Sequence, residues 1–168
     1  IFNNLTQGNY NIVVTDANGC TMALSSMVSN APGPVLSQVN TTDITCNGDD
    51  NGSITISASG GTGALSYSIN NGSTTQSGNA FNNLPPGIYN IVVSDINGCN
   101  ATSQVTIMEP ALLTATASSL TSTCGNANGV LNINAQGGTG TIQFSNNGGT
   151  TFQTGSSFIN LAQGNYNI

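Results

Sequence analysis

Few side chains in this sequence could take part in acid–base or nucleophilic chemistry. The chain has six acids and four cysteines but no Lys, Arg or His. Enzymes usually activate a nucleophile with a neighbouring base or pair a general acid with a general base, and His and Lys are the usual bases. Asp49 and Asp50 are adjacent carboxylates, but neighbouring side chains of an extended segment point apart. We therefore expect no enzymatic activity.

The same carboxylates could instead bind Ca²⁺, which prefers oxygen ligands gathered on a turn. The weak candidates are Asp49 and Asp50 in the segment 49–52, and Asp95 in Asp-Ile-Asn-Gly. The segment 125–129, which corresponds to the first of these in the repeat described below, contains no acid. Asp-x-Asn-Gly is also a tight-turn sequence, in which the Asp accepts backbone hydrogen bonds and Asn-Gly takes positive φ. We interpret both segments as turns and expect no metal or cofactor.

The absence of basic residues also limits the binding partners. The net charge is −6, whereas proteins bind nucleic acids and acidic membrane surfaces through Lys and Arg. The sequence has no apolar run long enough to insert into a membrane. Only 4% of the residues are charged, but 37% are hydrophobic, and this content favours a folded chain over a disordered one.

The elements that would position these residues recur along the chain. FNNLTQGNYNIVVTDANGC at 2–20 recurs as FNNLPPGIYNIVVSDINGC at 81–99 and, in part, as FINLAQGNYNI at 158–168. GSITISASGGTGALSYS at 52–68 matches GVLNINAQGGTGTIQFS at 129–145.

The period of this repetition sets the predicted domain organisation. Cys46 and Cys124 hold the same place in the pattern and are 78 residues apart. We predict the C-terminal part of one repeat at 1–31, a complete repeat at 32–110 and the N-terminal part of a following repeat at 111–168. The natural protein is expected to be longer.

Each repeat is predicted to be all-β. Apolar and polar residues alternate at 54–58 and again at 65–69, on either side of the Gly-Gly-Thr-Gly breaker at 60–63,. Asn97-Gly98 predicts a two-residue hairpin turn. A tyrosine that we expect to pack in the core, with its hydroxyl bonded to nearby backbone, recurs as Tyr10, Tyr89 and Tyr166. About six or seven short strands in each repeat predict an Ig-like β-sandwich.

These motifs together resemble the SprB-type repeats of gliding and cell-surface adhesins of Bacteroidota. The resemblance lies in the Asp-x-Asn-Gly-Cys endings at 16–20 and 95–99, preceded by a Cys-Asn-Gly loop, and in Gly-Gly-Thr-Gly at 60–63 and 137–140. It implies a very large secreted protein that acts at the cell surface in gliding, attachment or fibre formation. The strand after the first Gly-Gly-Thr-Gly differs from such repeats, because it lacks their frequent proline and tryptophan.

The cysteines occupy two positions of the repeat. Cys46 and Cys124 precede the second strand of their repeats, and Cys20 and Cys99 follow the hairpin turn. The extracellular setting implied by the resemblance favours disulfides, and the spacing does not suggest zinc ligands. The simplest assignment is Cys46–Cys99, with Cys20 and Cys124 paired outside this segment. The alternative joins Cys20 to Cys46 and Cys99 to Cys124 across the linkers, and sequence alone leaves both open.

These features predict a structural or adhesive segment of a long extracellular protein that forms a stalk or a self-assembling fibre. The expected partners are copies of the same protein, since the linkers contain Pro and the surface lacks the Lys residues that keep strand edges apart. The alternative is a carbohydrate-binding module that recognises surface glycans. Phe152 is the aromatic residue that favours it, because it lies where the complete repeat has Thr75.

Overall fold

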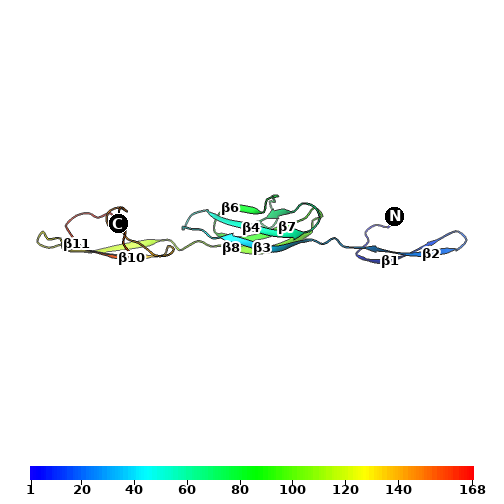
Figure 1. Cartoon of the computed structure of the whole chain (residues 1–168), viewed down its shortest axis with the longest axis horizontal. Helices are drawn as coiled ribbons and strands as arrows, with labels where there is room; N and C mark the ends of the chain where they lie inside the picture. The colour runs from blue at the N-terminus through cyan, green and yellow to red at the C-terminus, as the bar shows by residue number, and fades with distance from the viewer.

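The chain is an extended row of three β-structures, as Figure 1 shows. This computed structural model describes residues 1–168 and contains strands without any helix, so it has no helix that could cross a membrane. We call the three parts the N-terminal hairpin (β1 and β2), the central body (β3 to β8) and the C-terminal body (β9 to β11).

The central body consists of two three-stranded antiparallel sheets. One sheet has the order β3-β4-β6, formed by β3 (Pro34–Thr42), β4 (Gly52–Gly60) and β6 (Ala80–Leu84). The other has the order β5-β7-β8, formed by β5 (Ser66–Ser68), β7 (Gly87–Ser94) and β8 (Asn100–Ile107). The predicted all-β class is confirmed, and the arrangement is consistent with a β-sandwich.

The core lies between these two sheets. β4 contributes Ile54 and Ile56, and β7 contributes Ile91 and Val93, all of them buried. Ile107 at the end of β8 is fully buried against the same cluster. The alternation of apolar and polar residues in β4 and β7 points every second side chain inward, and burying each of these side chains contributes about 2 kcal/mol.

The two outer parts resemble the two sheets of the central body, one each. The C-terminal body contains β9 (Thr114–Leu120), β10 (Gly129–Gln136) and β11 (Ser157–Leu161) in the order β11-β10-β9, equivalent to β6-β4-β3. The N-terminal hairpin pairs β1 (Gly8–Thr15) with β2 (Thr21–Val28) in the register of β7 with β8. Neither outer part has a second sheet over its apolar face.

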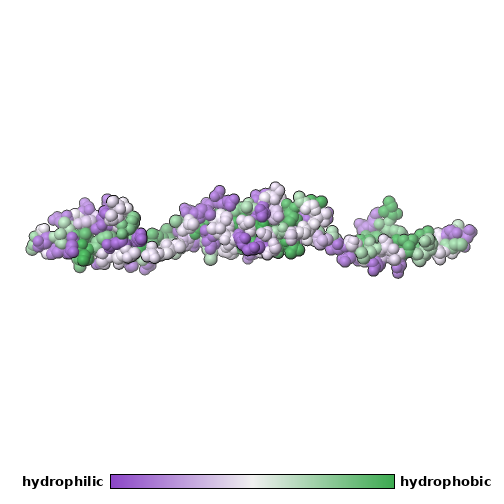
Figure 2. All heavy atoms as spheres, in the orientation of Figure 1, coloured by the Kyte–Doolittle hydropathy of each residue, from purple (hydrophilic) through white to green (hydrophobic).

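The consequence is visible on the surface of the N-terminal hairpin. In Figure 2 apolar residues gather over this hairpin, while the central body is mainly polar with smaller apolar areas. Val14 and Met22 of the hairpin are 57% and 69% exposed. Val93, which corresponds to Val14, is instead fully buried in the central body.

The recurring tyrosine makes the same contact in all three parts. The Tyr89 hydroxyl donates to the Pro85 carbonyl at 2.7 Å. Tyr10 and Tyr166 donate to carbonyls four residues upstream, at 2.7 and 2.9 Å. The predicted backbone hydrogen bond is therefore confirmed, although each ring is half-buried instead of fully buried. Burial, together with the negative charge of Asp50, raises the Tyr89 pKa.

Candidate functional site at the two ends of the central body

The loops of the central body are divided between its two ends. The N-terminal end holds the β7–β8 turn at 95–99 and the Gly-Gly-Thr-Gly turn at 60–63, next to the linker at 29–33. Pro34 at the end of this linker pairs with Gly60, and a Cβ placed on Gly33 would lie 3.2 Å from the Cys99 Cβ.

The C-terminal end holds the β3–β4 loop at 43–51, which contacts the linker at 108–112. The Ile44 amide donates to the Met108 carbonyl at 2.9 Å, and the Met108 amide donates to Asp43 Oδ1 at 2.9 Å. These two bonds extend the hydrogen bonding of the central body beyond the end of β8.

Further along this linker, side chains complete the attachment. The Gly48 amide donates to Glu109 Oε2, and Asn47 Nδ2 donates to the Pro110 carbonyl, both at 3.0 Å. On the far side, the Gly138 amide of the C-terminal body donates to the Ala111 carbonyl at 2.8 Å. Every residue from 108 to 111 is thus hydrogen-bonded to one body or the other, which makes this a held junction and not a free tether.

Asp95 joins the two turns at the N-terminal end. Its Oδ1 accepts hydrogen bonds from the Asn97 and Cys99 amides at 3.0 and 2.9 Å. Its Oδ2 accepts from the Thr62 amide of the Gly-Gly-Thr-Gly turn at 2.9 Å. The bond from Thr62, together with those within its own turn, holds the pKa of this carboxyl below its usual range, although burial opposes the shift.

The glycines of the Gly-Gly-Thr-Gly motif allow these two turns to meet. Gly61 has φ of +74°, and a Cβ there would lie 3.0 Å from the Asp95 Cβ. Gly63 has φ of +72°, and its Cβ would lie 2.9 Å from the Ile96 Cδ1. The turns formed by the motifs Asp-x-Asn-Gly-Cys and Gly-Gly-Thr-Gly therefore pack against each other. No local pattern in the sequence reports this contact.

The candidate calcium ligands are not brought together. Asp49 and Asp50 lie in the exposed β3–β4 loop at the C-terminal end, whereas Asp95 lies at the opposite end. Asp95 already accepts backbone hydrogen bonds at both of its oxygens. No group of three or more His, Cys, Asp or Glu side chains gathers anywhere in the structure. The turn interpretation accounts for the contacts of Asp95.

The predicted Cys46–Cys99 disulfide is not present, and all four cysteines are free. Cys46 lies beside the linker that follows β8, whereas Cys99 directly precedes β8. The eight residues of β8 span about 27 Å, while a disulfide requires Cα atoms within about 7 Å. The strand geometry thus opposes the predicted pairing.

The alternative pairing is opposed by the same geometry. Cys20 precedes β2 at the end of the N-terminal hairpin that lies away from the central body, so all of β2 and β3 separate it from Cys46. Cys124 follows β9, so β8 and β9 separate it from Cys99. Neither pair of cysteines shares a junction.

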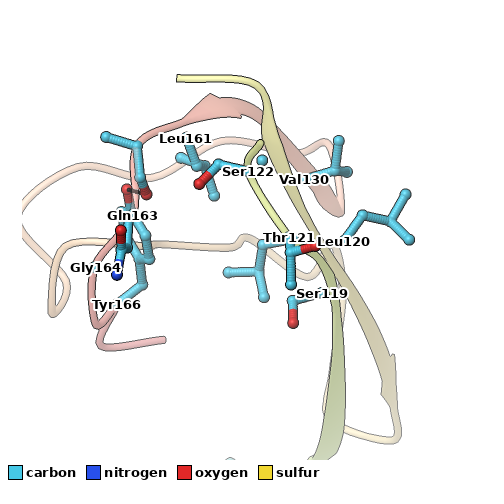
Figure 3. A pocket seen from close by; sticks show the side chains of 12 residues that line it. Ser119, Leu120, Thr121, Ser122, Val130, Leu161, Gln163, Gly164 and Tyr166 are labelled. Atoms are coloured by element: carbon cyan, nitrogen blue, oxygen red, sulfur yellow. Dashed lines mark hydrogen bonds between the residues drawn. The ribbon is translucent and has the colours of Figure 1, made fainter. Parts of the chain in front are cut away.

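Two hollows lie in the C-terminal body. Figure 3 shows one groove, with Leu120 and Val130 on one side and Gln163 and Tyr166 on the other. Gly129 lies in this groove, and its central counterpart Gly52 packs against Ile107 at the end of β8.

The second hollow is lined mainly by apolar residues, among them Ile133 and Phe152. The C-terminal body has one sheet, and in the central body the equivalent sheet is covered by a second one that includes the β7–β8 hairpin.

Residues 38–74 match the SprB repeat family. These residues cover the second part of β3 and all of β4 and β5 in the central body. This stretch is a SprB-type repeat, as the sequence resemblance predicted, and the match supports an adhesin-like repeat region of a cell-surface protein. No curated protein and no solved structure matches the chain.

Proposed function

We propose that this chain, which carries a SprB-type repeat at residues 38–74, is a structural segment of an extracellular adhesin in which Ig-like repeats are joined end to end into a stalk or fibre. The observation that carries this proposal is the linker at 108–111, which is hydrogen-bonded to the bodies on both of its sides. A linker held in this way sets the direction of the next body.

The strand topology supports an Ig-like repeat. The sheet orders β3-β4-β6 and β5-β7-β8 correspond to the A-B-E and C-F-G sheets of an Ig-like sandwich. Tyr89 at the start of β7 bonds back to the Pro85 carbonyl, as the tyrosine corner does in such domains. The central body would then be one complete repeat, at 32–110, between two partial ones.

The row of bodies in Figure 1 supports a stalk. The linkers are short, and the one at 108–111 takes part in the hydrogen bonding of its neighbours. Stacked repeats of this kind contact mainly the repeats before and after them. Such a chain extends a binding tip away from the cell without using any catalytic group.

The surface composition supports lateral association of such stalks into fibres, with copies of the same protein as partners. The chain has no Lys, which is a common device for keeping exposed strand edges apart. Neutral Asn, Gln, Ser and Thr side chains hydrogen-bond across an interface without the cost of burying charges. Each such bond contributes about 1 kcal/mol, and a repeated unit multiplies that contribution along the fibre.

Surface labelling of the producing cells tests this proposal. An antibody raised against the 168-residue chain is expected to label intact cells and to decorate thin projections in electron micrographs. Bundles of parallel projections would support the fibre, and separate strings would support the solitary stalk. Labelling that requires permeabilised cells would overturn the extracellular assignment.

A glycan-binding module is the second candidate, and Phe152 is the observation that favours it. Its side chain is 60% exposed and lines the second hollow of the C-terminal body, where its aromatic ring is open to a sugar. A glycan array with the whole chain separates the two proposals. Binding that is lost in Phe152→Ala but kept in Ile159→Ala, an equally exposed control, would favour the module. An array without binding favours the stalk.

A further inference from the structure

We propose that a disulfide joins successive repeats, between the β3–β4 loop cysteine of one repeat and the β7–β8 turn cysteine of the next. In this chain Cys46 and Cys124 are loop cysteines, and Cys20 and Cys99 are turn cysteines. The proposal rests on the end-to-end arrangement of the proposed function. It differs from both pairings expected from sequence. Cys46–Cys99 lies within one repeat, and Cys20–Cys46 joins the turn cysteine of one repeat to the loop cysteine of the next.

Cys46 lies in the β3–β4 loop, at the end of the central body that faces the next repeat. The two residues that follow it are attached to the linker at 108–112. Asn47 donates to the Pro110 carbonyl, and the Gly48 amide donates to the Glu109 carboxylate, both at 3.0 Å. Cys46 is exposed, so its thiol is open to reaction at the end of the central body where this linker leaves.

Cys99 lies at the opposite end of the central body from Cys46. It lies against the linker that enters the central body, because a Cβ on Gly33 would be 3.2 Å from the Cys99 Cβ. Each turn cysteine is therefore expected beside the linker that precedes its own body.

The C-terminal body allows this position to be transferred to the next junction. A Cβ on Gly60 would lie 3.3 Å from the Gly33 carbonyl oxygen, and a Cβ on Gly137 would likewise contact the Leu112 carbonyl oxygen. Leu112 therefore takes the place of Gly33, and the next turn cysteine is expected beside Leu112. Pro110, which Asn47 contacts, is two residues away and so at most about 7 Å distant.

This pairing is compatible with the four free cysteines of the structure. The C-terminal body ends in Gly-Asn-Tyr-Asn-Ile at 164–168, which is identical to residues 8–12 of the N-terminal hairpin. The turn cysteine lies eight residues after this motif, at Cys20. A turn cysteine placed in the same way after the motif at 164–168 would be the partner of Cys46. None of the four cysteines present shares a junction with another.

The reaction needs an oxidant, which is a disulfide donor such as an oxidised thiol–disulfide oxidoreductase or, in the test tube, oxidised glutathione. One cysteine thiolate attacks the donor disulfide, forms a mixed disulfide and releases one donor thiolate. The second cysteine thiolate attacks the mixed disulfide, so the inter-repeat S–S bond forms and the second donor thiolate leaves. Two protons are released from the cysteines and taken up by the donor thiolates.

The test is to complete the third body with the chain's own sequence. Residues 13–31 are appended after Ile168, since Ile168 corresponds to Ile12. The original Cys20 is replaced in Cys20→Ser, so that of the two copies of residues 13–31 only the appended one carries its cysteine. The protein is oxidised at low concentration with oxidised and reduced glutathione. It is then digested with pepsin, because trypsin has no cleavage site in a chain without Lys or Arg.

We expect the peptide that contains Cys46 to be linked to the appended turn peptide in most molecules. Cys46→Ser is expected to abolish the link, and Cys124→Ser is the matched control that keeps it. A Cys46–Cys99 link, a link found only between two chains, or a Cys46 that still reacts with iodoacetamide after oxidation would overturn the proposal. If Cys46 stays free in the oxidised chain while the antibody still labels surface strings on intact cells, the disulfide alone is rejected. The proposed stalk then stands.

Discussion

At the scale of single residues, Asp95 does more than stabilise its own turn. Asp16 occupies the same position in the N-terminal hairpin and makes the same two bonds, to the amides of Asn18 and Cys20 at 3.0 and 2.8 Å. Asp95 adds a third bond, to the Thr62 amide of a different turn. The comparison separates the turn from the contact between turns, because both residues share the first and only Asp95 has the second.

Replacing the two carboxylates tests this difference. Asp95→Asn is expected to lower the unfolding midpoint of the central body clearly, and Asp16→Asn to change it little. Because the folded pKa of Asp95 lies below its usual value, the carboxylate stabilises the fold above its unfolded pKa of about 3.9. That contribution is lost as the pH falls through the lower folded pKa.

Thermal unfolding followed by circular dichroism between pH 2 and pH 7 measures this effect. The difference between the original chain and Asp95→Asn should be full near neutral pH and should shrink below about pH 4. An equal difference at pH 2 and pH 7 would contradict the role of the ionised carboxylate.

Gly61 offers a second test at the residue scale. Gly61→Ala is expected to cost more than Gly98→Ala, although both glycines have positive φ. The left-handed conformation alone costs about 1–2 kcal/mol for a residue with a side chain, and nothing lies within 4 Å of a Cβ on Gly98. At Gly61 the new methyl group also meets Asp95 at 3.0 Å. Urea denaturation of both variants gives the comparison, and equal losses would argue against close packing of the two turns.

At the scale of the elements, β8 holds the two sheets together through its last residue. Ile107 is fully buried and packs against Gly52 of the opposite sheet. Ile107→Ala is expected to reduce the free energy of unfolding by about 2–5 kcal/mol, the range for a large-to-small change in a core. Ile88→Ala is the matched control, since Ile88 is 66% exposed and its loss should change stability by less than about 0.5 kcal/mol. Urea titration measures both, and similar losses would place the core elsewhere.

Most of these elements could be predicted from the sequence, because alternation reports directly which side chains point inward. The strand at 54–58, the turn at Asn97-Gly98 and the tyrosine hydrogen bond all follow from local patterns, and the structure contains them. The expected strand at 65–69 is shorter, since β5 covers Ser66–Ser68. It ends where the Ser68 hydroxyl accepts hydrogen bonds from the Asn70 and Gly72 amides and starts a turn.

The cysteine pairing could not be predicted, because it depends on the direction of each strand. β4 and β7 run the same way, because both end at the turns of the N-terminal end. Since β6 is antiparallel to β4 and β5 is antiparallel to β7, β5 and β6 also run the same way. Residues 69–79 therefore reverse the chain without forming a strand. The assignment of Cys46 to Cys99 used only their two positions in the repeat, and these positions do not report the end of the body at which each cysteine lies. The contact between Asp95 and Thr62 was missed for a related reason, since no local pattern reports which turns share an end.

At the scale of the whole molecule, the junction at 108–112 determines how far the bodies bend relative to each other. A chain with Asn47→Ala and Glu109→Ala loses two of the contacts between the β3–β4 loop and the linker. We expect this chain to keep its strand content but to have a smaller and broader distribution of end-to-end distances in small-angle X-ray scattering. Asp49→Ala, in the same loop but without a contact to the linker, is the control. An unchanged distribution would mean that the held linker does not set the direction of the bodies.

The path of the chain through the central body has a mechanical consequence. The chain enters at the start of β3 and leaves at the end of β8, and these two strands lie beside each other in opposite sheets. Because both run from the N-terminal end to the C-terminal end, tension along the stalk pulls β3 one way and β8 the other, parallel to their length. The body must then be sheared, with the packing of Ile107 and the ladders of β3–β4 and β7–β8 resisting together, whereas a hairpin pulled open from one end breaks one bond at a time. A surface protein under drag from moving liquid would therefore be loaded in shear, the direction in which its strands resist unfolding more strongly than a hairpin opened from one end.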